Sequence, residues 1–187
     1  MTIGFTLSSL LAAGVLLVLA AVFGIGAARR PDLWKTLPRE RVAGTFLALG
    51  SLAFSAWQAQ VLLEGGLARY MPFVWLLVPV LTVLACLYLD FLLTRALGGV
   101  LMLLAPQLLQ GAFDNHLPAR PAFSAVCYLC AVAGVLLMAA PWRFRDLLER
   151  AALRPGVRRI AAGTATLTAL VFLLAATFNL MRGSATP

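Results

Sequence analysis

Long apolar stretches separated by short charged segments are the main pattern of the chain, and six stretches carry no Asp, Glu, Lys or Arg. A helix needs about 20 apolar residues to cross the roughly 30 Å hydrocarbon core of a bilayer. The pattern therefore predicts an all-α fold, a polytopic membrane helix bundle with short loops, organised as one domain over 1–187. The six transmembrane helices are expected at about 3–28, 42–63, 71–93, 96–113, 122–140 and 160–181.

The region 71–113 could cross the membrane once or twice. A single helix of that length would reach about 65 Å, twice the hydrocarbon thickness, and one crossing would put the two most basic loops on opposite sides. Two crossings are therefore predicted, with a tight turn near 94–99, where Gly98 and Gly99 lie. The span 96–113 is the weakest of the six, because it is short and Pro106 removes an intrahelical hydrogen bond.

Basic residues are distributed unevenly between the predicted spans. Of the 15 Lys and Arg residues, 12 lie in the segments after the first, third and fifth spans. Positive charge is retained on the cytoplasmic side, so both termini are expected outside, in a membrane that we take to be the bacterial cytoplasmic (inner) membrane. No basic residue precedes the first apolar stretch, which is longer than the roughly 7 to 15 apolar residues of a leader, so a retained span is expected there.

The two longest basic loops are expected to face anionic lipid headgroups, which attract each Lys or Arg by about 1 kcal/mol. These loops contain Arg29, Arg30, Lys35, Arg39, Arg41, Arg143, Arg145, Arg150, Arg154, Arg158 and Arg159. Within them, 142–153 places Phe144, Leu147, Leu148 and Ala151 at helical spacing and predicts a short interfacial helix. Pro155 and Gly156, which follow, are expected to end that helix.

Composition excludes an ordinary soluble domain. The chain is 62% hydrophobic and 12% charged, with a mean hydropathy of +0.94, whereas soluble domains are about 45 to 50% apolar and about 25% charged. The net charge of +8 comes mostly from the basic loops and is explained as a topology signal. Membrane lipid and other membrane-protein subunits are the expected partners, and nucleic acid is not.

Cys127 and Cys130 form a C-x-x-C pair in the fifth predicted span, and such a pair can cycle between dithiol and disulfide. The string Cys127-Tyr-Leu-Cys130 resembles the membrane-edge pair of bacterial disulfide-generating quinone reductases. Those enzymes use a second, periplasmic cysteine pair, which this chain lacks. The resemblance implies a redox pair, and inert packing of two small apolar side chains is the alternative.

Asp90 is predicted about one turn from the cytoplasmic end of the third span. An ionisable residue inside a span is costly and is often functional. One interpretation is an interfacial ion pair between Asp90 and Arg95, and the other is a proton or cation relay.

The remaining polar residues suggest no catalytic, cofactor or metal constellation, since the chain has one histidine and seven scattered acids. We therefore predict no cofactor and a non-enzymatic integral membrane protein, a subunit, scaffold or assembly partner of a larger complex. One alternative is a small transporter or substrate-binding membrane subunit, for which Pro79 and Pro106 hint at broken helices. The other is a membrane thiol-redox protein that uses Cys127 and Cys130.

Overall fold

The computed structural model describes residues 2–29, 32–62, 68–117 and 119–185, which are helical almost throughout and contain no strand. Six helices are long and apolar enough to cross a membrane, which confirms the all-α bundle. Their bounds, with those of the shorter elements, are α1 Thr2–Ala21, a π-helix Val22–Gly26, α2 Ala27–Arg29, α3 Leu33–Thr36, α4 Arg41–Leu62, α5 Met71–Tyr88, α6 Leu92–Asp114, α7 Arg120–Ala139, α8 Pro141–Leu153 and α9 Pro155–Ala185; short 3-10 turns occur at Leu37–Arg39 and Ala68–Tyr70.

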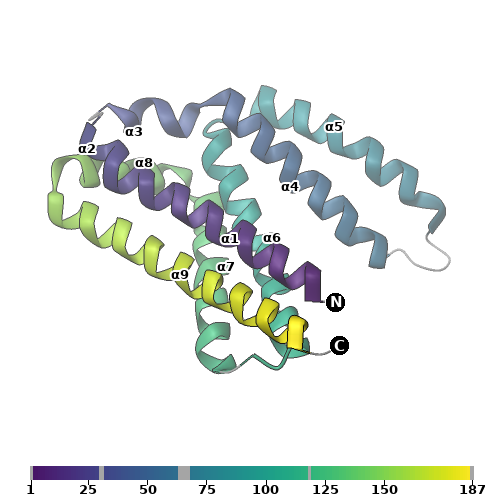
Figure 1. Ribbon diagram of the computed structural model, residues 1–187. Coiled ribbons are helices and arrows are strands. Elements are labelled where there is room, and N and C mark those ends of the chain that lie inside the picture. The colour runs from purple at the N-terminus through teal and green to yellow at the C-terminus, as the bar shows by residue number, and fades with distance from the viewer. Residues whose placement is uncertain (1, 30–31, 63–67, 118, 186–187) are drawn as a thin grey trace.

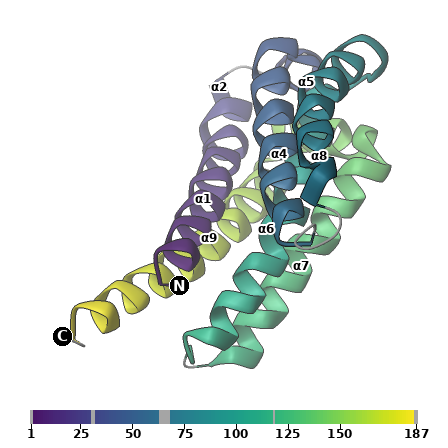
Figure 2. The same cartoon turned by 90° about the vertical axis from the view of Figure 1, so that its right-hand side faces the viewer.

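Three helix pairs make up the bundle (Figure 1). The central pair is α6 with α7; α1 packs along α9 on one side, and α4 packs on α6 on the other, with α5 attached through α4. Seen from the side, α4 and α5 form a separate hairpin next to α6, while α1 and α9 diverge from α7 (Figure 2). Both termini lie at the end of the bundle opposite α2, α3 and α8.

The main hydrophobic core lies where α1, α6, α7 and α9 meet. Three phenylalanines from different helices meet there: the ring centroid of Phe123 is 6.2 Å from that of Phe5, in a tilted arrangement, and 5.7 Å from that of Phe172, edge to face. Aromatic pairs of this kind contribute about 0.5 to 1.5 kcal/mol beyond their buried area. Near this core, Asn179 of α9 donates a buried 2.9 Å hydrogen bond to Thr6 Oγ1 of α1, which joins the two terminal helices.

The turn between the third and fourth spans is not where the sequence predicted it. The helix expected to extend to residue 93 ends at Tyr88, and α6 begins at Leu92, so the predicted turn at 94–99 lies inside α6. The break falls at Asp90, which is exposed, because a charge is best accommodated outside the hydrocarbon. Phe91 completes the turn in the left-handed region, at φ 59°.

Gly98 serves helix packing instead of a turn. A Cβ added there would lie 2.6 Å from the carbonyl oxygen of Gly134 on α7, and a Cβ at Gly134 would lie 2.7 Å from that of Gly98. The two backbones therefore approach at a distance that only glycine permits. The span expected to be weakest is the most buried of the six candidate spans, and α6 continues through Pro106.

Proline lies in the first turn of several helices, α5 among them. Pro121, Pro141 and Pro155 occupy the first turns of α7, α8 and α9, where the missing N–H is unneeded and the fixed φ suits a helix. Arg154, just before Pro155, is extended at φ −123° and ψ 107°, as steric contact with a following proline favours. The 142–153 segment thus forms a helix that ends before Pro155, while the last span begins five residues earlier than predicted.

Candidate functional site

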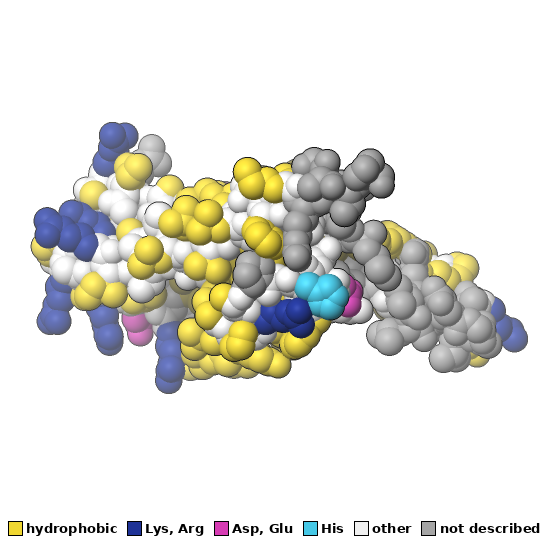
Figure 3. All heavy atoms as spheres, turned by 60° about the horizontal axis from the view of Figure 1, so that its bottom comes forward, with side chains coloured by type: hydrophobic (Ala, Val, Ile, Leu, Met, Phe, Trp, Pro, Cys, Tyr) yellow, Lys and Arg dark blue, Asp and Glu magenta, His cyan; other side chains and the backbone are white. Residues whose placement is uncertain are grey.

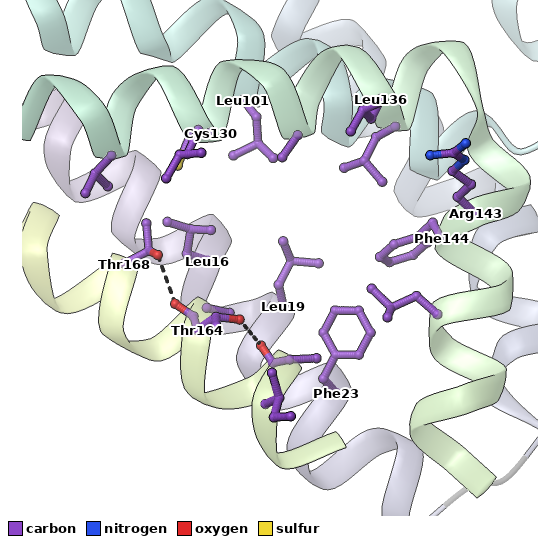
Figure 4. A pocket seen from close by; sticks show the side chains of 18 of the residues that line it. Leu16, Leu19, Phe23, Leu101, Cys130, Leu136, Arg143, Phe144, Thr164 and Thr168 are labelled. Atoms are coloured by element: carbon purple, nitrogen blue, oxygen red, sulfur yellow. Dashed lines mark hydrogen bonds between the residues drawn. The ribbon is translucent and has the colours of Figure 1, made fainter. Parts of the chain in front are cut away.

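A cavity of about 750 Å³ opens in the half of the bundle nearest α8. Ligand pockets commonly measure about 300 to 1,000 Å³. The wall residues come from α1, the π-helix, α6, α7, α8 and α9, and Figure 4 shows α7 and α9 facing each other across the space. Leu129 on α7 and Ile160 on α9 are both 70% exposed, so the cavity opens at the surface of the bundle between these two helices.

The lining is almost entirely apolar. Its polar side chains are Arg143, Cys130, Thr164 and Thr168. Both threonines donate to their own helix, Thr164 to the carbonyl oxygen of Ala161 at 3.1 Å and Thr168 to that of Thr164 at 2.9 Å. The hydroxyl groups are thus already satisfied, and the surface offered to a ligand is hydrocarbon over most of its extent.

A π-helical segment in the first span forms the back of the cavity near α8. Segments of this kind are rare and frequently mark functional sites. Phe23, within Val22–Gly26, is buried and lines the cavity. Its ring meets that of Phe144 edge to face at 5.9 Å and 78°, so the π-helix and α8 together close this end of the space (Figure 4).

The two longest basic segments meet at the α8 end of the bundle. The ring centroid of Trp34 on α3 lies 5.1 Å from Lys35 Nζ and 5.4 Å from the guanidinium carbon of Arg145 on α8. Figure 3 shows basic side chains gathered at this end, beyond the hydrophobic middle of the molecule. Of the predicted basic residues, Arg30 and the side chain of Arg39 lie outside what the structure describes. The structure thus joins two segments that the sequence leaves far apart.

Asp90 lies before the start of α6, and Arg95 lies inside that helix. Asp90 is exposed between α5 and α6, and Arg95 is partly buried in the first turns of α6. Among the described residues, ion pairs join Lys35 Nζ to Asp32 Oδ1 at 2.8 Å and Arg145 Nε to Asp146 Oδ1 at 3.9 Å. The described ion pairs therefore do not include Asp90–Arg95. Arg95 Nε is buried without a described hydrogen-bond partner.

Cys127 and Cys130 are free thiols on α7 and differ in their surroundings. Cys127 is fully buried in the main core, whereas Cys130 lines the cavity. A third free thiol, Cys86, lies 3.1 Å from the Thr45 hydroxyl, between α5 and α4. Within the described ranges, no three residues of the types His, Cys, Asp and Glu gather closely enough to hold a metal ion.

The sequence did not predict the cavity or the position of Arg143 in its lining, because Arg143 looks there like one of many basic loop residues. A partial signal was present: Ala161, Thr164, Ala165 and Thr168 occupy positions i, i+3, i+4 and i+7 and give α9 a face of small side chains. Such a face indicates either close packing or a hollow. Which of the two occurs depends on the helix opposite, and the sequence does not give that.

The six apolar helices define the class of the chain, which is an integral membrane protein. Comparison with protein-family models, with curated proteins and with solved structures finds no match.

Proposed function

We propose that the chain is a non-enzymatic subunit of a membrane complex that holds one apolar-tailed lipid in the cavity between α1, α7, α8 and α9. The observation that carries this proposal is the cavity itself, with its apolar lining and its opening between α7 and α9. In a bilayer that opening faces hydrocarbon, so a lipid can enter sideways without crossing water. The lining provides van der Waals contact along a chain, which suits binding better than acid–base chemistry.

The dimensions of the cavity suit a chain from one leaflet. Its walls run from Val126 to Leu137 on α7 and from Val157 to Thr168 on α9, which is about 16 Å at about 1.5 Å per residue. Half of the roughly 30 Å hydrocarbon core is about 15 Å. A lipid whose headgroup lies beside α8 would therefore end near the middle of the bundle.

The subunit role rests on how the chain is organised. Most of its described length lies in the six candidate spans and in α8. Contacts with other proteins must then be made mostly in the membrane plane or at the α3–α8 surface. Native gel electrophoresis of mildly solubilised membranes should show a particle well above the 20.0 kDa chain. Migration of the chain as a monomer with only detergent and lipid would overturn the subunit role.

Photo-crosslinking tests the lipid-binding role directly. A phospholipid with a diazirine in the middle of one acyl chain would be added to vesicles that contain the protein, and the labelled peptides would be mapped. We expect labelling of the cavity walls on α7 and α9 above that of α5, whose Val83 and Leu87 are equally apolar and are 57% and 72% exposed. Equal labelling of every exposed apolar face would show only general contact with lipid and would overturn the proposal.

A thiol-redox function is the second candidate, because Cys130 lines the cavity and Cys127 is one helical turn away. An apolar oxidant in the cavity would reach the Cys130 sulfur first. The test replaces both cysteines by Ala. The lipid-binding proposal expects normal abundance and normal lipid labelling, whereas loss of a thiol-oxidising phenotype in cells would favour the redox function. The transporter alternative gains no support, since α5 and α6 continue through Pro79 and Pro106 without a break.

A further inference from the structure

Arg143 is the one charged residue among those that line the described cavity. It lies in the first turn of α8, at the end that this helix closes, and its side chain borders the space (Figure 4). Neighbouring Arg145 is engaged by the Trp34 ring and by Asp146. The guanidinium of Arg143, by contrast, makes no ion pair or hydrogen bond with any residue that the structure describes. An apolar cavity thus has a single cationic group at one end.

We propose that the ligand is an anionic phospholipid of the leaflet on the α8 side, with its headgroup phosphate on Arg143 and an acyl chain between α7 and α9. This inference rests on the proposed function and adds the chemical class of the lipid. A guanidinium presents a planar fork of donors that matches phosphate oxygens in a bidentate arrangement. Arg143 is exposed at the rim of the cavity, so a headgroup can reach its guanidinium from outside the bundle.

The charges around this end favour an anion. Arg154 precedes α9, and Arg158 and Arg159 lie in its first turns, close in sequence to the wall residues Val157 and Ile160. The acids of α8 are Asp146 and Glu149, and neither lines the cavity. A zwitterionic headgroup would add a second cation beside these arginines, whereas a headgroup with net negative charge would not.

The test compares two vesicle lipids that share the same acyl chains, phosphatidylglycerol and phosphatidylcholine. The full chain would be reconstituted in an equal mixture and extracted with mild detergent, and the lipid that remains bound would be counted by native mass spectrometry. We expect about fivefold enrichment of phosphatidylglycerol, the effect of about one interfacial basic residue. Arg143→Gln should remove most of this enrichment, and only the weaker attraction of Arg154, Arg158 and Arg159 should remain. Arg150→Gln removes the same charge from another exposed position of α8, which does not line the cavity, and should preserve the enrichment.

The outcomes separate this inference from the function on which it depends. If one lipid stays bound but the wild-type chain shows no preference for phosphatidylglycerol, the cavity binds lipid and the headgroup assignment is wrong. If both variants lose the preference equally, the basic surface as a whole attracts anionic lipid, and Arg143 has no special role. If the wild-type chain retains no lipid, the proposed function itself fails. A circular dichroism spectrum of each variant would confirm that the helices are retained.

Discussion

At the scale of single residues, Asp90 shows how one charge can place a helix end. The sequence offered two signals for a turn, the acid at 90 and the glycines at 98 and 99, and we predicted the turn at the glycines. The structure has it at Asp90. Glycine is ambiguous in a membrane helix because it serves turns and close helix contacts alike, whereas a charged group inside hydrocarbon has few favourable alternatives.

Because Asp90 lies in the turn between α5 and α6, the effect of replacing it can be predicted. Its carboxylate is exposed in a turn, so Asp90→Asn should leave membrane abundance and thermal unfolding unchanged. A relay would give a different result, since Asn cannot exchange a proton and activity would stop at normal abundance. Complementation by Asp90→Asn at matched abundance measures the difference. Total loss of activity in a folded variant would favour transport over the lipid-holding subunit.

The buried hydrogen bond of Asn179 leads to a second prediction about a single residue. Its side chain is 3% exposed and donates to Thr6 across the contact between α1 and α9. Interhelical hydrogen bonds in membranes contribute about 0.6 to 2 kcal/mol, so Asn179→Leu should lower the free energy of unfolding by about that amount. Thr177→Val, on an exposed neighbouring site whose hydroxyl bonds only within α9, is the control. Equal stability of the two variants in a detergent unfolding assay would argue against this bond as a helix tie.

At the scale of elements, most of what the structure shows could be predicted. Charge spacing indicated six helices. Of the four apolar positions that indicated α8, Phe144, Leu148 and Ala151 are buried, whereas Leu147 is 39% exposed. That the fourth span is the most buried of the six candidate spans could not be predicted. Its glycines and proline look like defects in the sequence, yet α6 is the helix on which α4 and α7 pack. A helix that is weak by itself gains stability from its neighbours, and the sequence does not name those neighbours.

The contact between α6 and α7 yields the prediction at this scale. In Gly134→Ala the new Cβ would lie 2.7 Å from the Gly98 carbonyl oxygen, so the helices must separate. We expect a loss of about 1 to 3 kcal/mol, measured by thermal unfolding of the purified protein in detergent. Gly14→Ala is the matched control, because a Cβ at Gly14 meets nothing within 4 Å. If both alanines were tolerated equally, the close approach of the two helices would be wrong.

At the scale of the whole molecule, the pairing of α1 with α9 and the cavity beside them lay beyond the sequence. α7 and α9 meet through Phe123 and Phe172 in the main core, and nearer to α8 they face each other across the cavity. Arg143 becomes a candidate ligand-binding residue only through this arrangement, since its sequence neighbours include several similar arginines. The basic segments were predicted to share one side of the membrane, and in the structure they share one end of the bundle.

Orientation in the membrane follows as a prediction from that arrangement. Reporter fusions after Lys35 and after Arg150 should both report the cytoplasm, because positive loops are retained there. Fusions after Arg69 and after His116 should report the opposite side. Cytoplasmic signals from only one of the two basic segments would contradict the six-span topology, and the α8 end of the cavity would then not face the inner leaflet.

The number of lipid molecules that the purified chain retains decides whether the cavity is a lipid site. Native mass spectrometry of the detergent-purified protein should show one phospholipid bound to the wild-type chain. Ala133→Phe, which places a large side chain in the cavity from the α7 wall, should lose that lipid. Val135→Phe enlarges a 47% exposed α7 side chain that is outside the lining, and it should retain the lipid. An unchanged lipid count in Ala133→Phe, or several lipids bound alike to all three proteins, would contradict the claim that the cavity is a lipid site.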